Sequence, residues 1–162
     1  MGNRILKLQK ETFYHIYNRG CNKQTLFFEK QDFKKFFIII SKNKKRYPEI
    51  EILAYSVLPN HFHLLLQDNL LGLSHSNCEI SNFMQKIQQS YTMFFNTKYG
   101  EKIKKGRKSP IFEGRFQAKI ITEESYLEYV KMYIEWNGVK HGLVKTPEKW
   151  LYSSYNRDKF PE

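Results

Sequence analysis

The chain has 162 residues, 41% of them hydrophobic, which suits one domain over residues 1–162 with a buried core and is too short to expect two. Lys and Arg outnumber Asp and Glu by 27 to 16, and the formal charge of +11 attracts polyanions, with nucleic acid as the expected partner. No apolar run reaches membrane-span or signal-peptide length, so we expect a cytoplasmic protein with no membrane partner. Cys21 and Cys78 lie far apart in the sequence, so we expect neither a disulfide framework nor a cysteine-based zinc site.

The first half of the chain predicts a strand, a helix and a hairpin. Phe13–Arg19 alternates aromatic and polar residues, as strands do. From Asp32 to about Lys45, apolar residues recur at helical spacing with lysines on the other face. Glu51–Leu58 and His61–Gln67 are apolar strands, and the turn signal Pro59-Asn60 between them indicates a hairpin.

A loop at Gly72–Asn77 precedes a long predicted helix. Apolar and aromatic residues recur at helical spacing from Ile80 to Phe95, and Gly100 is the expected C-cap. Glu101–Pro110 (EKIKKGRKSP) then predicts a basic loop.

The C-terminal part predicts a strand, a helix and a docked tail. Phe116–Thr122 has strand composition, and Thr122 followed by two glutamates indicates the start of a helix that runs to about Gly138. The tail from Trp150 onward is expected to dock through its aromatic side chains, which are Trp150, Tyr152 and Tyr155.

The order of these elements begins with the split βαββαβ pattern. We therefore predict an α+β fold, a ferredoxin-like sandwich with an antiparallel sheet and helices on one face. The last helix, which carries several tyrosines, is an addition to that fold.

His61 and His63 stand one residue apart on a predicted strand, directly after a turn. Side chains alternate across a strand, so the two imidazoles share one face and Phe62 points to the other. Paired imidazoles suit a divalent metal, although at least one more ligand must come from elsewhere. Such a pair more often packs or hydrogen-bonds on a sheet face, but its place at a strand end in a basic chain favours function.

The last predicted helix places several polar and aromatic residues on one face, namely Tyr126, Tyr129, Val130, Tyr133 and Asn137. A tyrosine hydroxyl can attack phosphorus, and a metal-polarised phosphate would assist that attack. The amide oxygen of Asn137 could bind the same metal. Packing is the commoner role for such a stripe in a chain with 11 tyrosines and 13 phenylalanines.

Five segments carry a family resemblance over nearly the whole chain. They are YHIYNRGCNKQTLF (14–27), VLPNHFHLLL (57–66), SPIFEGRFQAKIIT (109–122), YLEYVKMYIEWNGVKHGLV (126–144) and WLYSSY (150–155). In this order they resemble the IS200-like single-tyrosine (Y1) transposases of the HUH nuclease superfamily, and most of all the REP-associated tyrosine transposases. PNHFHLL with a downstream YIxxN and GLV is far more specific than two spaced histidines.

The resemblance implies roles for individual residues. His61 and His63 would be the HUH pair and would bind a divalent metal, Mg²⁺ or Mn²⁺, with Asn137 as the third protein ligand. Tyr133 would be the catalytic nucleophile toward single-stranded DNA, often a hairpin with a flanking tetranucleotide. Its attack would leave a 5′-phosphotyrosine link and a free 3′-OH, and a second 3′-OH would reverse the link.

The chain departs from the family pattern at Asn137-Gly138-Val139, where Asn-Pro-Val is common. Both Gly and Pro stop a helix, so we expect Asn137 to keep its place. Tyr129 and Tyr133 also form the two-tyrosine spacing of rolling-circle initiators in the same superfamily. Because the other segments follow the single-tyrosine pattern, we interpret Tyr129 as a packing residue.

The residues expected to bind DNA are basic or polar side chains in or near the matching segments. They are Asn18, Arg19, Lys23, Arg107, Arg115 and Lys119. Such side chains contact phosphates, and arginine also stacks on bases or reads their edges. Arg19 and Arg115 are preferred because each lies beside a glycine within a matching segment.

Two functions from different classes fit these observations. The first is a metal-dependent enzyme that cleaves and transfers DNA strands, in transposition or in processing REP-type hairpins. The second is a catalytically silent module that binds nucleic-acid hairpins on a ferredoxin-like sheet. The second predicts binding without metal and without a covalent adduct. Monomer and homodimer both remain open.

Overall fold

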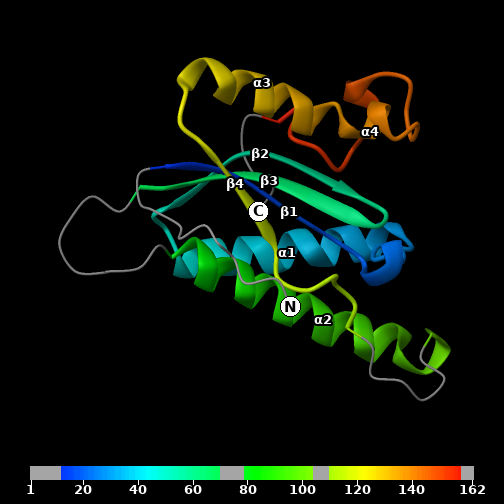
Figure 1. Ribbon diagram of the computed structural model, residues 1–162. Coiled ribbons are helices and arrows are strands. Elements are labelled where there is room, and N and C mark those ends of the chain that lie inside the picture. The colour runs from blue at the N-terminus through cyan, green and yellow to red at the C-terminus, as the bar shows by residue number, and fades with distance from the viewer. Residues whose placement is uncertain (1–11, 70–78, 104–109, 158–162) are drawn as a thin grey trace.

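The protein is described by a computed structural model that covers residues 12–69, 79–103 and 110–157. Its centre is a four-stranded antiparallel sheet with helices on both faces (Figure 1). The strands are β1 (Phe13–Arg19), β2 (Ile50–Leu58), β3 (His61–Asp68) and β4 (Gln117–Ile121), in the spatial order β2-β3-β1-β4. This topology confirms the predicted ferredoxin-like α+β fold.

The main core lies between the sheet and the two helices α1 (Lys30–Arg46) and α2 (Ile80–Ile103), on the lower face in Figure 1. Alternate residues along each strand point toward these helices and form the part of the core that the sheet contributes. They include Tyr14, Ile16, Phe62, Leu64 and Leu66, all fully buried. The alternation of side chains along a strand therefore sends His15, His61 and His63 to the opposite face.

That opposite face is covered by α3 (Glu124–Glu135) and the short α4 (Asn137–Lys140) (Figure 1). A small apolar cluster joins α3 to the sheet, made of Ala54, Leu65, Ile121, Val130 and Ile134. The added helix is thus anchored by its own small core on the face of the sheet that carries the histidines.

The C-terminal tail docks at the end of β2 through two of its three aromatic residues. Trp150 donates from Nε1 to the carbonyl of Val57 at 3.1 Å, just after the 3₁₀ turn η2 (Pro147–Lys149). Tyr152 stacks on Phe33 with ring centres 3.8 Å apart. Tyr155 is 43% exposed, so the expectation that it also docks the tail is wrong.

The predicted end of the second helix is also wrong. The helix α2 passes through Gly100 and continues to Ile103, where a loop was expected from Glu101. Tyr99 explains the extension, because its hydroxyl donates to the buried carboxylate of Asp32 at 2.7 Å and holds the last turns against α1. The predicted loop at 72–77 and residues 104–109 lie outside the described residues.

The tyrosine-bearing helix differs from the prediction at both ends. It begins at Glu124 with Glu123 as N-cap, rather than at Thr122, because the amides of Tyr126 and Leu127 bond to the Glu123 carbonyl. It ends at Glu135 and not at about Gly138, and α4 begins two residues later.

Within the described ranges, no helix is long and apolar enough to cross a membrane.

Candidate active site

The histidine pair lies at the start of β3, on the face that α3 and α4 cover. His61 is opposite Arg19 of β1, and His63 is opposite Tyr17. The two imidazole centres are 5.2 Å apart, with the ring planes nearly perpendicular. His63 is 8% exposed, whereas His61 is half-buried. The pair therefore presents two ring edges to the same small region.

A third histidine, His15 of β1, belongs to the same cluster. Its Nε2 is 2.9 Å from Nδ1 of His63, and both rings are buried. The sequence reasoning missed His15, because only the β1–β3 register places it diagonally across from His63. Its position two residues before Tyr17 on an alternating strand was the one available signal.

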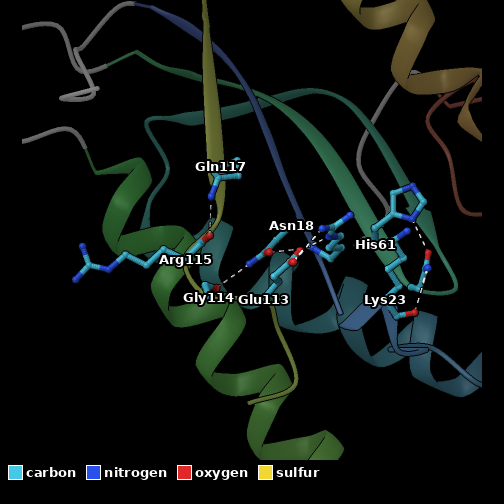
Figure 2. A network of polar contacts seen from close by, with 9 residues as sticks. Asn18, Lys23, His61, Glu113, Gly114, Arg115 and Gln117 are labelled. Atoms are coloured by element: carbon cyan, nitrogen blue, oxygen red, sulfur yellow. Dashed lines mark hydrogen bonds and ion pairs between the residues drawn. The ribbon is translucent and has the colours of Figure 1, made fainter. Parts of the chain in front are cut away.

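Nδ1 of His61 is held in a similar way. It lies 2.6 Å from Oδ1 of Asn60, and Nδ2 of Asn60 donates to the carbonyl of Lys23 at 3.3 Å. Figure 2 shows Lys23 and His61 on either side of this link. Both histidines thus use Nδ1 within the protein, which leaves Nε2 as the nitrogen for a metal or a substrate.

All three imidazoles are neutral at neutral pH. Burial, aided by the charge of Lys119, lowers the pKa of His15 to about 4. Burial, with nearby positive charges led by His141, lowers the pKa of His61 to about 4. Burial, with His15 as the next cause, lowers the pKa of His63 to about 2. A metal would therefore meet neutral rings, each with a lone pair on one nitrogen, and would not have to displace the second proton of an imidazolium ring.

Tyr133 of α3 lies above this cluster. Its ring centre is 6.0 Å from that of His15 and 6.1 Å from that of His63, both in edge-on arrangements. Its hydroxyl accepts a hydrogen bond of 2.9 Å from Nζ of Lys140, the last residue of α4. The sequence predicted Tyr133 as a site residue but gave no indication of Lys140.

Asn137 is fully buried at the start of α4. The helix break at Trp136 separates it from α3, but its Nδ2 still reaches back to the carbonyls of Tyr133 at 2.8 Å and Ile134 at 3.2 Å. Its Oδ1 has no hydrogen-bond partner among the described residues. A buried amide oxygen without a donor is costly unless another group, such as a cation, binds it.

These donors fit a divalent metal. Imidazole nitrogens suit transition metals and carbonyl oxygens suit Mg²⁺ and Mn²⁺, so the two imidazoles and the orphaned amide oxygen would supply mixed nitrogen and oxygen donors. Over residues 12–69, 79–103 and 110–157, no group of three or more His, Cys, Asp or Glu side chains could hold a metal. The fit therefore depends on the amide of Asn137 as the third ligand.

Two of the residues expected to bind DNA take part in contacts within the protein. Asn18 is 5% exposed, and its Nδ2 donates to the carbonyl of Gly114 at 3.0 Å. Arg19 is half-exposed and pairs with the carboxylate of Glu113. Asn18 thus holds the segment before β4 in place, and Arg19 reaches solvent beside His61.

The other candidates lie on the surface around this region. Lys23 and Arg115 are exposed, and the Arg115 side chain extends away from the other labelled residues in Figure 2. Lys119 is exposed on β4, with its Nζ 5.7 Å from the ring centre of Tyr17. Arg107 lies outside the described residues.

The two remaining tyrosines of α3 face solvent. Tyr126 and Tyr129 are 51% and 53% exposed and stack on each other with ring centres 5.6 Å apart. Tyr129 therefore packs against another surface ring and not in the core.

Comparisons with known proteins point to one family. The sequence model of the family described as "Transposase IS200 like" matches residues 9–137. A candidate REP-associated tyrosine transposase of Haemophilus influenzae is 32% identical over an alignment of 120 residues. The match covers 70% of this chain and 63% of the length of that protein.

Solved structures agree with the sequence match. A REP-associated tyrosine transposase bound to a REP hairpin superposes with a TM-score of 0.73 at 25% identity, over 98% of this chain and 84% of the other. The tRNA(His) guanylyltransferase of Saccharomyces cerevisiae superposes with a TM-score of 0.53 at 13% identity, over 85% of this chain and 61% of the other. The second likeness concerns the fold alone.

Proposed function

Since the chain belongs to the family of IS200-like transposases, we propose that it cleaves and rejoins single-stranded DNA through a covalent link to Tyr133. The observation that carries this proposal is the position of Tyr133 beside the histidine cluster. Its ring centre is 6.1 Å from that of His63. Asn137, with its orphaned oxygen, begins α4 immediately after the same helix.

The proposed step exchanges one phosphate ester for another. The hydroxyl oxygen of Tyr133 attacks the scissile phosphorus, a tyrosine–phosphorus ester forms and the bond from phosphorus to the 3′ oxygen breaks. The phenolic proton is transferred, directly or through water, to the leaving 3′ oxygen, which departs as a hydroxyl. A 3′-OH of another strand reverses these changes, so joining needs no external source of energy.

His61, His63 and Asn137 would hold a divalent metal, for which Mg²⁺ and Mn²⁺ are the candidates. When bound, the ion supplies Lewis-acid polarisation of the scissile phosphate. The protein's own groups supply the rest: each neutral ring has a nitrogen lone pair available, and Lys140 donates to the hydroxyl that becomes the ester oxygen.

The proposed substrate is a single-stranded DNA that contains a hairpin. Two observations support this choice. The formal charge of +11 favours binding to a phosphate backbone, and a structural relative at 25% identity is bound to a REP hairpin. Three exposed cations are the candidate phosphate contacts, namely Arg19, which is opposite His61, Lys119 and Arg115.

The test is a denaturing-gel assay with labelled hairpin DNA carrying single-stranded flanks, in the presence of Mn²⁺. Wild type is compared with Tyr133→Phe and with Tyr129→Phe, a matched control on the same helix whose ring faces solvent. We expect a covalent protein–DNA band in wild type and Tyr129→Phe, and loss of the band in Tyr133→Phe or after addition of a chelator.

Two outcomes would contradict the proposal. A band that persists in Tyr133→Phe would assign the nucleophile to another residue. Tight binding of hairpins without any band, over a varied set of flanks, would identify the chain as the catalytically silent binding module.

A further inference from the structure

We propose that Asn60 and His15 are positioning residues that fix the ring orientation and tautomer of the two metal-binding histidines. Each accepts a hydrogen bond from Nδ1 of its histidine, Asn60 from His61 and His15 from His63, and so directs Nε2 toward the metal. The inference rests on the proposed function, because that function supplies the metal.

The orientation of Asn60 follows from its two contacts. Nδ2 can only donate, and it points to the carbonyl of Lys23. Oδ1 must then face His61 at 2.6 Å, and since an amide oxygen can only accept, His61 carries its proton on Nδ1. The lone pair of His61 is left on Nε2.

The carbonyl that orients Asn60 is itself held by an unusual backbone turn. Asn22 and Lys23, in the 3₁₀ turn η1 (Cys21–Lys23), have φ angles of 53° and 59°, in the left-handed region. The amide of Gly20 also donates to the carbonyl of Asn60 at 2.8 Å. The segment that follows β1 and the hairpin turn before β3 are therefore held together next to His61. Figure 2 shows Lys23 and His61 at the two ends of this link.

The contact between Nε2 of His15 and Nδ1 of His63, at 2.9 Å, joins two ring nitrogens, of which one donates and the other accepts. Ligation through Nε2 of His63 requires the proton on Nδ1, so His15 must then be the acceptor through its own Nε2. The ring of His15 is 8% exposed and packs against Tyr17 with centres 5.2 Å apart, which limits its rotation.

Metal-binding histidines commonly donate their second ring N–H to a carboxylate, a carbonyl or water. Here both acceptors are neutral. They orient the rings without adding negative charge beside a site that has to receive a phosphate.

The first experiment reads the tautomers directly by ¹⁵N NMR of the metal-free wild-type protein labelled at histidine. We expect Nδ1 of both His61 and His63 to show the shift of a protonated nitrogen and Nε2 that of an unprotonated one. A proton on Nε2 of His63 would overturn the role of His15, and a proton on Nε2 of His61 would overturn the role of Asn60. This measurement needs no substitution and stands if a variant fails to fold.

The second experiment measures Mn²⁺ affinity by electron paramagnetic resonance, without DNA. His15→Phe and Asn60→Leu remove the acceptors, and we expect each to weaken Mn²⁺ binding by about 10- to 100-fold. His15→Gln and Asn60→Asp keep an acceptor oxygen and should restore most of the affinity. His141→Phe replaces an imidazole whose centre lies 4.7 Å from that of His61 with an apolar ring, and it should leave the affinity unchanged.

Hairpin binding in a chelator should be equal in all variants, which separates a lost metal site from a lost fold. If His15→Phe and Asn60→Leu bind Mn²⁺ as tightly as wild type does and a covalent adduct still forms on Tyr133, the positioning role of His15 and Asn60 is overturned and the proposed function stands. If the affinities fall as expected but wild type forms no adduct, positioning stands and the proposed function fails.

Discussion

Lys140, the last residue of α4, donates a hydrogen bond of 2.9 Å to the hydroxyl of Tyr133, and its ammonium lies 4.3 Å from the centre of the same ring. The two residues belong to different helices, and the break at Trp136 allows the second helix to bring the cation back over the first. A positive charge thus stands beside the oxygen on which negative charge develops as the proton leaves.

Replacement of Lys140 by Met should therefore slow the formation of the covalent adduct. A hydrogen bond from a charged donor is worth about 1.5–3 kcal/mol, which corresponds to a rate loss of about 10- to 100-fold. Single-turnover assays with hairpin DNA would measure the rate, and Lys140→Arg should recover part of it. Lys145→Met, an exposed lysine outside this contact, is the control; equal loss in that variant would mean that Lys140 acts through general charge.

Two glycines should respond in opposite ways to alanine. At Gly138 a Cβ atom would lie 2.7 and 2.8 Å from side-chain atoms of Trp150, so Gly138→Ala should lower the free energy of unfolding by about 1–3 kcal/mol. At Gly100, inside α2, the added carbon would meet no atom within 4 Å beyond the neighbouring residues and the helix's own backbone, and Gly100→Ala should raise the free energy of unfolding by about 0.5–1 kcal/mol. Urea unfolding measures both. An unchanged or raised free energy in Gly138→Ala would contradict the packing at Trp150, and a lowered one in Gly100→Ala would contradict the helical gain expected at Gly100.

The sheet and α1 could be predicted from the sequence because their apolar spacing is a local signal. The end of α2 could not be predicted, since Gly100 is a helix terminator by local propensity and the bond from Tyr99 to Asp32 overrides it. That bond joins two helices and depends on packing that no local pattern encodes.

The candidate site was predictable only where the periodicity of one element decides the geometry or where the family motif names the residue, as for Tyr133 and Asn137. His61 and His63 share a face because strand side chains alternate. The contact of His15 with His63 depends on the register between β1 and β3, and that of Lys140 with Tyr133 depends on the break at Trp136. Neither the register nor the break has a signal in a single sequence.

The exposed cations and Asn18 should affect DNA binding differently. Arg115→Gln and Lys119→Gln should each weaken binding and reduce the slope of log affinity against log salt by about 0.7, as for the loss of one phosphate contact on a single strand. Asn18→Ala should leave the slope unchanged and lower the stability by about 1–3 kcal/mol, because its buried amide holds the Gly114 carbonyl. Fluorescence anisotropy over a salt series, with unfolding curves for each variant, tests this; an unchanged slope for both cations would remove them from the interface.

The buried carboxylate of Asp32 should make stability depend on acid pH. It is fully buried, and it accepts hydrogen bonds from Lys98 at 2.6 Å, from Tyr99 and from the backbone at the start of α1. Burial, the largest single influence, raises the pKa of Asp32, but these donors together outweigh it and hold the pKa below its ordinary value of 3.8.

A lowered pKa means that the unfolded chain takes up the proton first as the pH falls. The stability from Asp32 is thus fully present above about pH 4 and is lost as the pH falls through the folded-state pKa. Asp32→Asn should lower the free energy of unfolding at pH 7 by about 2–3 kcal/mol, less than for a fully buried ion pair because Lys98 is 27% exposed. Urea unfolding from pH 7 to pH 3 should show the gap to wild type narrowing below pH 4, with Glu128→Gln, an exposed carboxylate on α3, as the control. A gap that stays constant down to pH 3 would mean that the carboxylate contributes through packing and not through its charge.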